Sequence, residues 1–436
     1  MKYHKDKLTI YIAEEREKLI ADIKNRETKL RIETDLINDI VGPRRAGKTS
    51  LMRLEMKKLI EKIDKIRIIY INFESRKLYP LTPEYFNDII EIIYEENSLR
   101  SGKIYLFLDE IQRINGWEKY VRSIYDEFKG KIKIFISGST SKLTKTNMSY
   151  LLSGRHLTSV VFPLSFREFL YFNKIEFDKP LTEEKRARIK KALKDYQTLG
   201  GFPEVVLTKD DGIIETLFLD IINRDIAPNV ENKEVLEDLA YFLCSNSANL
   251  TSFSKMVNIL KSRGINISVP TLEKYFNLMK EAFLFFDNTI FSYKVKDQLQ
   301  YPRKIYCIDN GFINYFGFKF SEDAGRLMEN SVAISLYRNS YQYPKKKIFY
   351  FKTALGEEVD FVIKEGLKVK QLIQVCDDIN DTDTKEREVK ALIKASKELK
   401  CNKLLVINDY YESEEKIKGK NIKFILLWKW LLDDKI

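Results

Sequence analysis

The stretch Gly42-Pro43-Arg44-Arg45-Ala46-Gly47-Lys48-Thr49 decides the fold of the first part of this 436-residue chain. It matches the pattern G-x-x-x-x-G-K-[ST], and it lies between an apolar run at residues 36–41 and a helix expected over 48–60. Glycines at both ends let successive backbone N–H groups turn inward and surround a phosphate. A basic turn before a helix would explain neither glycine. The stretch therefore predicts a phosphate-binding loop between a buried strand and a helix.

The side chains of this loop are each expected to make a different contact with the nucleotide. Lys48 is expected to neutralise β- and γ-phosphate oxygens, and Thr49 to offer its hydroxyl group to Mg²⁺. Arg45 is a further candidate for a phosphate contact. The residues predicted to bind the nucleotide are Gly42, Pro43, Arg44, Arg45, Ala46, Gly47, Lys48, Thr49 and Ser50.

An acidic pair follows the apolar run at residues 105–108. Ligands of open α/β sheets bind at the carboxyl ends of the strands, which is where this pair would lie. Asp109 is expected to hold Mg²⁺ through water, and Glu110 to polarise the water that attacks the phosphate. Without the loop sixty residues upstream, the same pair could be an exposed turn.

Polar residues also follow the apolar run at 134–136. Ser137 and Ser139 are candidates for a hydrogen bond to the γ-phosphate or to the attacking water, although helix capping by Ser139 or Ser141 explains the pattern equally well. Arg155 is a candidate for the arginine that stabilises the transition state, supplied in cis or by a neighbouring subunit. Such an arginine accelerates phosphoryl transfer by about 10³–10⁵.

The pattern of hydrophobic residues divides the chain into three regions. Residues 1–175 alternate short apolar strands with helices, which predicts a parallel sheet covered by helices on both faces. Residues 176–320 are expected to form a helical lid and a winged-helix domain, with a helical pattern over 182–249 that Gly200-Gly201 interrupts. Residues 321–436 are expected to form a small α/β domain, with a helix, three strands, an amphipathic helix and further strands.

The end of the second region carries a more specific pattern. Helices are expected over 252–263 and 268–282, and the apolar runs 283–286 and 289–293 read as a hairpin with its turn at Asp287-Asn288. Two helices followed by a hairpin are the outline of a winged helix, whose second helix would read DNA. The alternative is a helical linker that packs against the first domain.

Several motifs together resemble one known family. The loop, Leu106-Phe-Leu-Asp-Glu-Ile-Gln, Ile136-Ser-Gly-Ser-Thr-Ser and Phe162-Pro-Leu-Ser-Phe-Arg-Glu-Phe are similar to those of the archaeal and bacterial AAA-type P-loop ATPases. Gly200-Gly-Phe-Pro, Asn223-Arg-Asp-Ile and Pro302-Arg-Lys-Ile-Tyr-Cys-Ile-Asp are similar to the C-terminal region that accompanies this ATPase. The resemblance implies ATP and Mg²⁺ as cofactors, an AAA core, a winged helix and a restriction-endonuclease-like last domain.

The resemblance of the last domain to the PD-(D/E)XK nuclease fold rests on Gly356-Glu-Glu-Val-Asp-Phe-Val-Ile, with Asp360 as the metal ligand that it implies. The next strand should bring a carboxylate and a lysine, but it reads Gln374-Val375-Cys376. A neutral amide is a poor ligand for Mg²⁺, and a thiol does not replace a lysine's charge. Glu329 could supply a carboxylate but leaves the lysine missing. We therefore expect a scaffold rather than an active nuclease.

Composition limits the possible functions. Hydrophobic residues make up 44% of the chain, which excludes wholesale disorder, and only two histidines are present, which argues against imidazole-rich metal sites. The N-terminus is charged and no apolar run approaches 20 residues, so we expect a cytoplasmic protein without a membrane span. The net charge of +11 favours a polyanionic partner.

These observations predict a Mg²⁺-dependent ATPase that works as a nucleotide-driven switch, with double-stranded DNA as its partner. Two alternatives stay open. The first is a signalling or scaffolding ATPase whose partner is a protein or a second copy of the chain. The second is a nuclease regulated by ATP.

Overall fold

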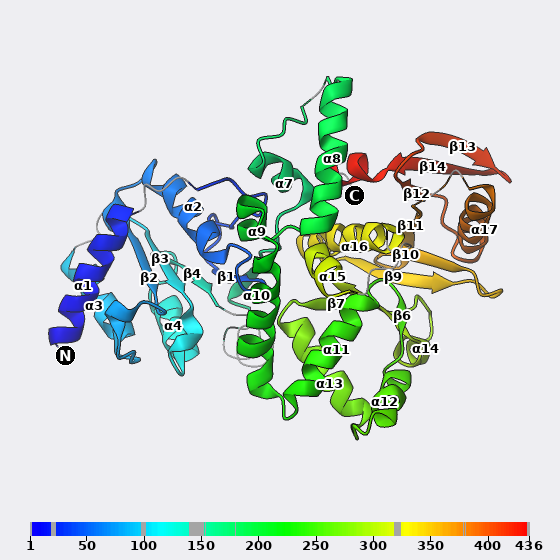
Figure 1. Ribbon diagram of the computed structural model, residues 1–436. Coiled ribbons are helices and arrows are strands. Elements are labelled where there is room, and N and C mark those ends of the chain that lie inside the picture. The colour runs from blue at the N-terminus through cyan, green and yellow to red at the C-terminus, as the bar shows by residue number, and fades with distance from the viewer. Residues whose placement is uncertain are drawn as a thin grey trace. The chain divides into compact units, whose positions relative to one another are not determined.

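The computed structural model describes residues 2–18, 23–96, 102–138, 152, 154–178, 180–317, 324–377, 379 and 381–433. The chain forms two compact units, Met1–Val161 and Phe162–Ile436. Figure 1 shows a sheet among the blue and cyan helices of the first unit, and green to red helices and sheets in the second.

The first unit is built on a five-stranded sheet. Its strands are β1 (Ile37–Val41), β2 (Ile68–Asn72), β3 (Ile104–Asp109), β4 (Ile132–Ser137) and β5 (His156–Val160), in the order β2-β3-β4-β1-β5. Every pairing in it is parallel. The inner strands are buried along nearly their whole length, as a parallel sheet covered on both faces requires. The α/β fold predicted for this region is confirmed.

Four helices accompany this sheet: α1 (Lys2–Glu17), α2 (Lys48–Ile60), α3 (Tyr85–Glu95) and α4 (Trp117–Glu127). Helix α2 begins directly after the glycine-bounded loop and buries Leu51, Met52 and Met56 in the same cluster as the stacked rings of Phe107 and Phe135. These two rings belong to β3 and β4 and lie 4.4 Å apart between centroids. This packing fixes the start of α2 against the sheet.

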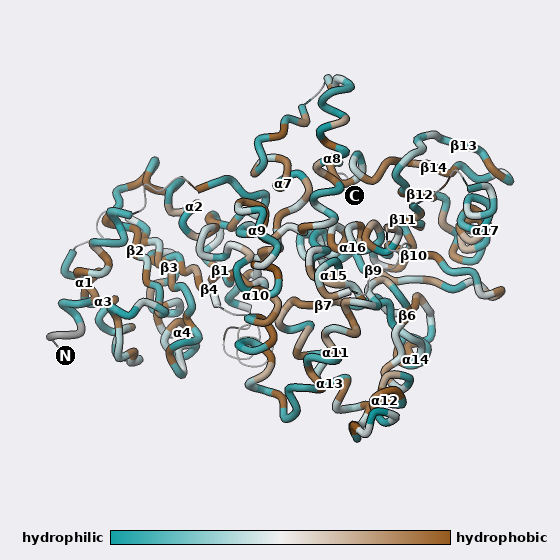
Figure 2. The backbone as a smooth tube through the Cα atoms, in the orientation of Figure 1, coloured by the Kyte–Doolittle hydropathy of each residue, from teal (hydrophilic) through white to brown (hydrophobic). Residues whose placement is uncertain are grey.

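The second unit opens with helices. They are α7 (Phe166–Phe172), α8 (Glu183–Leu199), α9 (Pro203–Thr208), α10 (Gly212–Asp220) and α11 (Lys233–Ser245), with a π-helical turn at Ile221–Ile226. Figure 2 shows that α8 is largely hydrophilic, whereas α10 carries more hydrophobic residues. Between α8 and α9, Gly201 N–H donates a 2.6 Å hydrogen bond to the buried carboxylate of Asp309.

A three-stranded antiparallel sheet follows, in the order β6-β8-β7. The elements in this segment are β6 (Leu250–Thr251), α12 (Phe253–Ser262), α13 (Val269–Glu281), β7 (Phe285–Asn288), α14 (Val295–Gln300) and β8 (Arg303–Cys307). The predicted hairpin turn at Asp287-Asn288 is wrong, because both residues lie inside β7 and pair with Ile305 and Lys304 of β8. The apolar run that follows lies beside another strand: Ile290 forms a bridge with Tyr350.

The C-terminal part contains a six-stranded mixed sheet in the order β13-β14-β12-β11-β10-β9. Its elements are α15 (Asn310–Phe316), α16 (Ala324–Gln342), β9 (Lys346–Lys352), β10 (Glu358–Glu365), β11 (Lys368–Val375), α17 (Thr382–Glu398), β12 (Leu404–Asn408), β13 (Ser413–Ile417), β14 (Lys420–Leu426) and α18 (Leu427–Leu432). Strand β13 was not predicted, because its sequence Ser-Glu-Glu-Lys-Ile carries no apolar pattern and it pairs only at the edge of the sheet.

Within the described ranges, no helix is both long enough and apolar enough to cross a lipid bilayer. The four cysteines Cys244, Cys307, Cys376 and Cys401 are buried free thiols.

Candidate functional site

The loop that follows β1 has the backbone conformation that its two glycines predict. Gly42 has a φ of +149° and Gly47 a φ of +100°, both in the region that side chains disfavour. A Cβ atom at Gly42 would lie 2.1 Å from the carbonyl oxygen of Val161, so only glycine fits there. Helix α2 starts at Lys48, and the loop therefore leads directly into its N-terminus, where backbone N–H groups lack helical acceptors.

The ammonium group of Lys48 lies on the inner side of this loop. Its Nζ donates hydrogen bonds of 3.0 Å to Gly42 O and 3.1 Å to Pro43 O, and the residue is only 7% exposed. A buried ammonium group held against backbone carbonyls is a positive charge aimed at the space that the loop encloses. Of the other two cations of the loop, Arg44 is half-buried and Arg45 is exposed with a φ of +59°.

Asp109 is the centre of a hydrogen-bond network at the carboxyl edge of the sheet. Its Oδ2 accepts hydrogen bonds from Thr49 Oγ1 at 2.7 Å and from Tyr70 Oη at 2.8 Å. Its Oδ1 accepts a short hydrogen bond from Ser137 Oγ. The carboxylate is fully buried, and its partners come from α2, β2 and β4. The structure thus brings together three residues predicted from the sequence, Thr49, Asp109 and Ser137.

Glu110 follows Asp109 in a left-handed backbone conformation, with a φ of +54°. Burial raises the pKa of its carboxyl group above the ordinary glutamate value, and the nearby charge of Lys48 opposes that shift. Gln112 Nε2 donates a 2.6 Å hydrogen bond to Glu110 Oε2 and so orients the carboxylate. The backbone N–H of Glu110 lies 3.4 Å from Ser137 Oγ, which connects this residue to the Asp109 network.

The structure does not bring Arg155 to the loop. Its carbonyl oxygen accepts a hydrogen bond from Ile37 N, at the amino end of β1, and its side chain forms an ion pair of 2.9 Å with Asp126. Five residues of extended strand separate that level from Gly42, about 16 Å. If Arg155 stabilises the transition state of hydrolysis, it therefore does so at the loop of a neighbouring subunit. Ser139 lies outside the described residues.

Two contacts of the site were not predicted. Tyr70 donates to Asp109 from the middle of β2. Burial, together with the charge of that carboxylate, raises the pKa of the Tyr70 phenol, so the hydroxyl group stays a donor. The sequence did offer one indication of Tyr70, because a single tyrosine stands among three isoleucines in this strand. Arg26 Nη1 donates a 2.9 Å hydrogen bond to Ala46 O in the loop. It lies in a segment without periodicity, and nothing in the sequence pointed to it.

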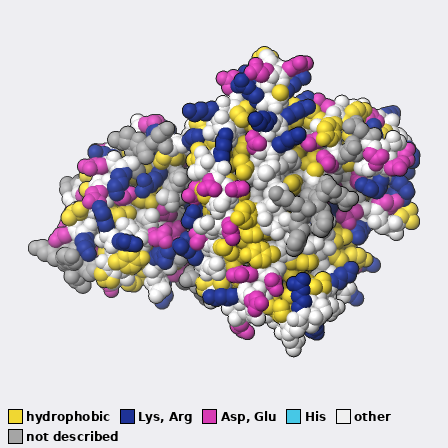
Figure 3. Space-filling view, viewed as in Figure 1, with side chains coloured by type: hydrophobic (Ala, Val, Ile, Leu, Met, Phe, Trp, Pro, Cys, Tyr) yellow, Lys and Arg dark blue, Asp and Glu magenta, His cyan; other side chains and the backbone are white. Residues whose placement is uncertain are grey.

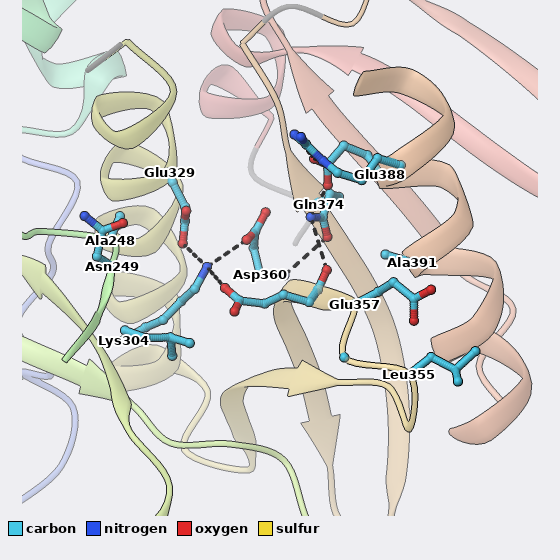
Figure 4. Close-up of a pocket in the computed structure, with 14 residues that line it drawn as sticks. Ala248, Asn249, Lys304, Glu329, Leu355, Glu357, Asp360, Gln374, Glu388 and Ala391 are labelled. Atoms are coloured by element: carbon cyan, nitrogen blue, oxygen red, sulfur yellow. Dashed lines mark hydrogen bonds and ion pairs between the residues drawn. The ribbon is translucent and has the colours of Figure 1, made fainter. Parts of the chain in front are cut away.

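A second polar cluster lies in the other unit, in a cavity of about 780 Å³. Lys304 Nζ, from β8, is 2.9 Å from Glu329 Oε1, 2.7 Å from Glu358 Oε1 and 2.8 Å from Asp360 Oδ1. Figure 4 shows the nitrogen pointing between Glu329 of α16 and Asp360 of β10. This lysine is not the one that the nuclease resemblance places after Gln374, and it comes from a strand about seventy residues earlier in the chain.

Gln374 and Cys376 occupy the positions where the nuclease resemblance places a carboxylate and a lysine, and Gln374 is bonded to the backbone of Asp360 in this cluster. Gln374 Oε1 accepts a 3.3 Å hydrogen bond from Asp360 N, and its amide nitrogen donates to Glu388, which pairs with Arg387. Burial raises the pKa of the Cys376 thiol to about 12, which keeps the thiol neutral. Among the described residues, no three His, Cys, Asp or Glu side chains are arranged to hold a metal ion.

The parallel sheet, the glycine-bounded loop and the buried Asp109 beside Thr49 define an AAA-type P-loop domain. Residues 35–170 match the AAA domain family. Residues 190–323 match a domain of unknown function, DUF8612, and residues 324–430 match another, DUF4143.

Relatives extend over nearly the whole chain. It is 34% identical over 429 residues to the uncharacterized protein MJ1544 of Methanocaldococcus jannaschii, covering 94% of this chain and 92% of that one. It is 30% identical over 406 residues to an uncharacterized protein of Haemophilus influenzae, covering 91% and 94%. The chain therefore belongs to the family of these two proteins. In this chain an AAA domain is followed by DUF8612 and DUF4143.

Among solved structures, the Walker-type ATPase PABY2304 of Pyrococcus abyssi is 14% identical, with a TM-score of 0.41. The similarity covers 65% of this chain and 91% of that one.

Proposed function

We propose that this chain binds ATP with Mg²⁺ at Gly42–Thr49, hydrolyses it, and uses the cycle as a switch on double-stranded DNA. The observation that carries the nucleotide part is the buried carboxylate of Asp109, bonded to Thr49 Oγ1 at the start of α2 and to Ser137 Oγ at the end of β4. This network ties the phosphate-binding loop to two strand ends at the edge of the sheet where ligands of such folds bind.

The donor set at this edge fits a magnesium ion. Mg²⁺ prefers oxygen ligands and keeps several of its waters, and Thr49 and Asp109 offer a hydroxyl and a carboxylate oxygen side by side. These two residues would hold the ion, which when bound neutralises charge on the β- and γ-phosphates. Tyr70 and Ser137 fix the orientation of the carboxylate through their hydroxyl hydrogen bonds.

Glu110 is the residue we assign to the activation of water. Its raised pKa makes its carboxylate a stronger base than an exposed glutamate, and the hydrogen bond from Gln112 holds it in one orientation. Steady-state release of phosphate from ATP tests this assignment, with Lys48→Ala and Glu110→Gln as variants. Turnover of the unmodified chain no faster than that of both variants would defeat the proposal of hydrolysis.

The proposal of a DNA partner is supported by the surface charge of residues 253–303. Every exposed charged side chain in this segment is basic, and the acidic ones are all partly buried. The exposed ones are Lys255, Lys261, Arg263, Lys274, Lys294 and Lys296. Figure 3 shows basic side chains over this part of the second unit, at the lower right. Such a surface attracts the phosphate backbone of a nucleic acid.

The order of elements supports the same partner. Helices α12 and α13 are followed by the paired strands β7 and β8, with β6 on the other side of β8. In winged-helix proteins the second of two such helices enters the major groove. On α13 the exposed Lys274 lies on the side opposite the buried Leu272, Tyr275 and Phe276, and is accessible to such a partner.

Duplex binding measured across a salt series tests the DNA part. Substituting Lys261, Arg263 and Lys274 by alanine should weaken binding at least tenfold and lower the salt slope by about one per lost phosphate contact. The matched control substitutes Arg186, Lys190 and Lys191 on α8, which removes the same charge elsewhere. Absence of binding at low salt, together with nucleotide-dependent self-association, would favour a protein partner instead.

A further inference from the structure

The side chain of Lys304 is a buried cation inside a ring of carboxylates. It is 4% exposed, and three carboxylate oxygens lie 2.7–2.9 Å from its Nζ. Two of these carboxylates, of Glu329 and Asp360, are themselves nearly buried. They come from α16 and β10, whereas Lys304 comes from β8, so the cluster joins two sheets of the second unit.

Electrostatics explain why the lysine and the acids require one another. Burial alone would lower the pKa of Lys304, but the charges of Asp360, Glu329 and Glu358 outweigh this effect and raise it. Burial raises the pKa of Glu329 to about 7, while Lys304 opposes that shift. Without the ammonium group, three carboxylates would face one another in a poorly solvated cavity, which is costly unless another cation replaces it.

The nuclease resemblance implies a divalent metal at Asp360, and the residues present do not fit one. Asp360 Oδ1 pairs with Lys304, while Oδ2 accepts a 2.9 Å hydrogen bond from Val375 N. A divalent ion would need oxygen ligands at about 2.0–2.6 Å, in the volume that Nζ fills. The other expected ligand position is Gln374, whose amide is engaged with Asp360 N and Glu388.

We propose that the ammonium group of Lys304 is the built-in cation of this pocket, in the place where a nuclease fold would hold its metal. The site therefore binds no divalent cation, and the domain does not cleave DNA by metal-assisted hydrolysis. Lys304 instead connects the β6-β8-β7 sheet to the C-terminal sheet. This inference is independent of the proposed ATPase function, because all of its residues lie in Phe162–Ile436.

The proposal predicts that removal of the lysine creates a metal site. In nucleotide-free full-length protein, Lys304→Ala should bind one more Mn²⁺ per chain than the unmodified protein, measured by the loss of the free Mn²⁺ signal in electron paramagnetic resonance. The added Asp360→Asn substitution should weaken that Mn²⁺ site at least tenfold. Lys394→Ala is the matched control, since Lys394 pairs with Glu357 at the rim of the same cavity. It should bind as many Mn²⁺ ions as the unmodified protein.

Thermal unfolding gives a second readout. Lys304→Ala should lower the midpoint, and Mn²⁺ should raise it again in this variant but not in Lys394→Ala. A folded Lys304→Ala that gains no Mn²⁺ would overturn the proposal. If Lys304→Ala does not fold, Mn²⁺ binding to the unmodified protein still tests whether the pocket holds a divalent cation. A bound Mn²⁺ that disappears in Asp360→Asn, or metal-dependent nicking of plasmid that this substitution abolishes, would show that Lys304 does not take the metal's place.

Discussion

Thr49 Oγ1 donates a 2.7 Å hydrogen bond to Asp109 Oδ2, although sixty residues separate them in the chain. The bond joins the first turn of α2 to the last residue of β3. It therefore holds the end of the glycine-bounded loop against the strand that ends at Asp109, directly before Glu110. Because Asp109 is fully buried and has three hydroxyl partners, the carboxylate is fixed before any ligand arrives.

The first prediction concerns the cation of the loop. Lys48→Ala removes the ammonium group that lies on the carbonyls of Gly42 and Pro43, and with it the charge that faces a triphosphate. ATP affinity should fall at least tenfold, or about 1.4 kcal/mol, measured by fluorescence titration with a labelled ATP analogue. Lys57→Ala, in the last turn of the same helix, removes the same charge and should leave affinity unchanged. Equal affinity of the two variants would contradict this role.

The second prediction separates hydrolysis from binding. Glu110→Gln keeps the shape of the side chain but removes its basicity, so turnover should fall about 10²-fold or more while ATP affinity stays within a few-fold. The unmodified enzyme should lose activity on acidification at a higher pH than an ordinary glutamate would give, because only the ionised form accepts a proton and burial raises its pKa. A pH–rate profile checks this. If Glu110→Gln keeps the turnover of the unmodified enzyme and the same loss of activity at low pH, Glu110 does not activate the water.

The third prediction concerns the backbone of the loop. In Gly42→Ala the new methyl group would meet the backbone oxygen of Val161 at 2.1 Å, and neither partner is a flexible side chain. We expect a loss of more than about 2 kcal/mol in the unfolding free energy, or a displaced loop that no longer binds ATP. Gly116→Ala is the control: its φ is +72°, but nothing lies within 4 Å of the added atom. Chemical denaturation should show a cost of only about 1 kcal/mol there.

The fourth prediction concerns the motif Gly200-Gly-Phe-Pro, for which the sequence alone indicated no structural role. Gly201 N and Gly311 N donate to the two oxygens of Asp309, and a Cβ atom at Gly200 would lie 1.6 Å from Asp309 Oδ1. Gly200→Ala should therefore destabilise the second unit by more than about 2 kcal/mol. Gly264→Ala has a similar φ of +82° in open space and should cost about 1 kcal/mol. Equal unfolding midpoints for Gly200→Ala and Gly264→Ala would show that the close packing of Gly200 against the Asp309 carboxylate does not contribute to stability.

Local signals in the sequence were sufficient for the first domain. Fixed glycine spacing and buried apolar runs predicted the loop and the parallel strands. They also assigned Thr49 and Asp109 to one Mg²⁺ site, and the structure adds the direct hydrogen bond between the two side chains. These features depend on the preferences of neighbouring residues and on the rule that parallel strands end at a common edge.

Features that depend on distant contacts were not predictable in this way. Asp287 and Asn288 are turn-forming residues, yet both lie in a strand, where Asp287 pairs with Lys280 and Arg303. The position of Lys304 among three carboxylates depends on sequence separations of 25 to 56 residues, for which no spacing rule exists. Arg155 shows that a suggestive position in the sequence can also mislead. It lies at the amino ends of the parallel strands, whereas the loop follows the carboxyl end of β1.

Amide hydrogen exchange across residues 42–49, followed by mass spectrometry, tests the central claim most directly. At the lowest ATP concentration that saturates the unmodified protein, with Mg²⁺ present, the backbone N–H groups of this loop should become protected at least tenfold in that protein and clearly less in Lys48→Ala. Exchange that is the same with and without nucleotide in the unmodified protein would show that these amides do not hold a triphosphate.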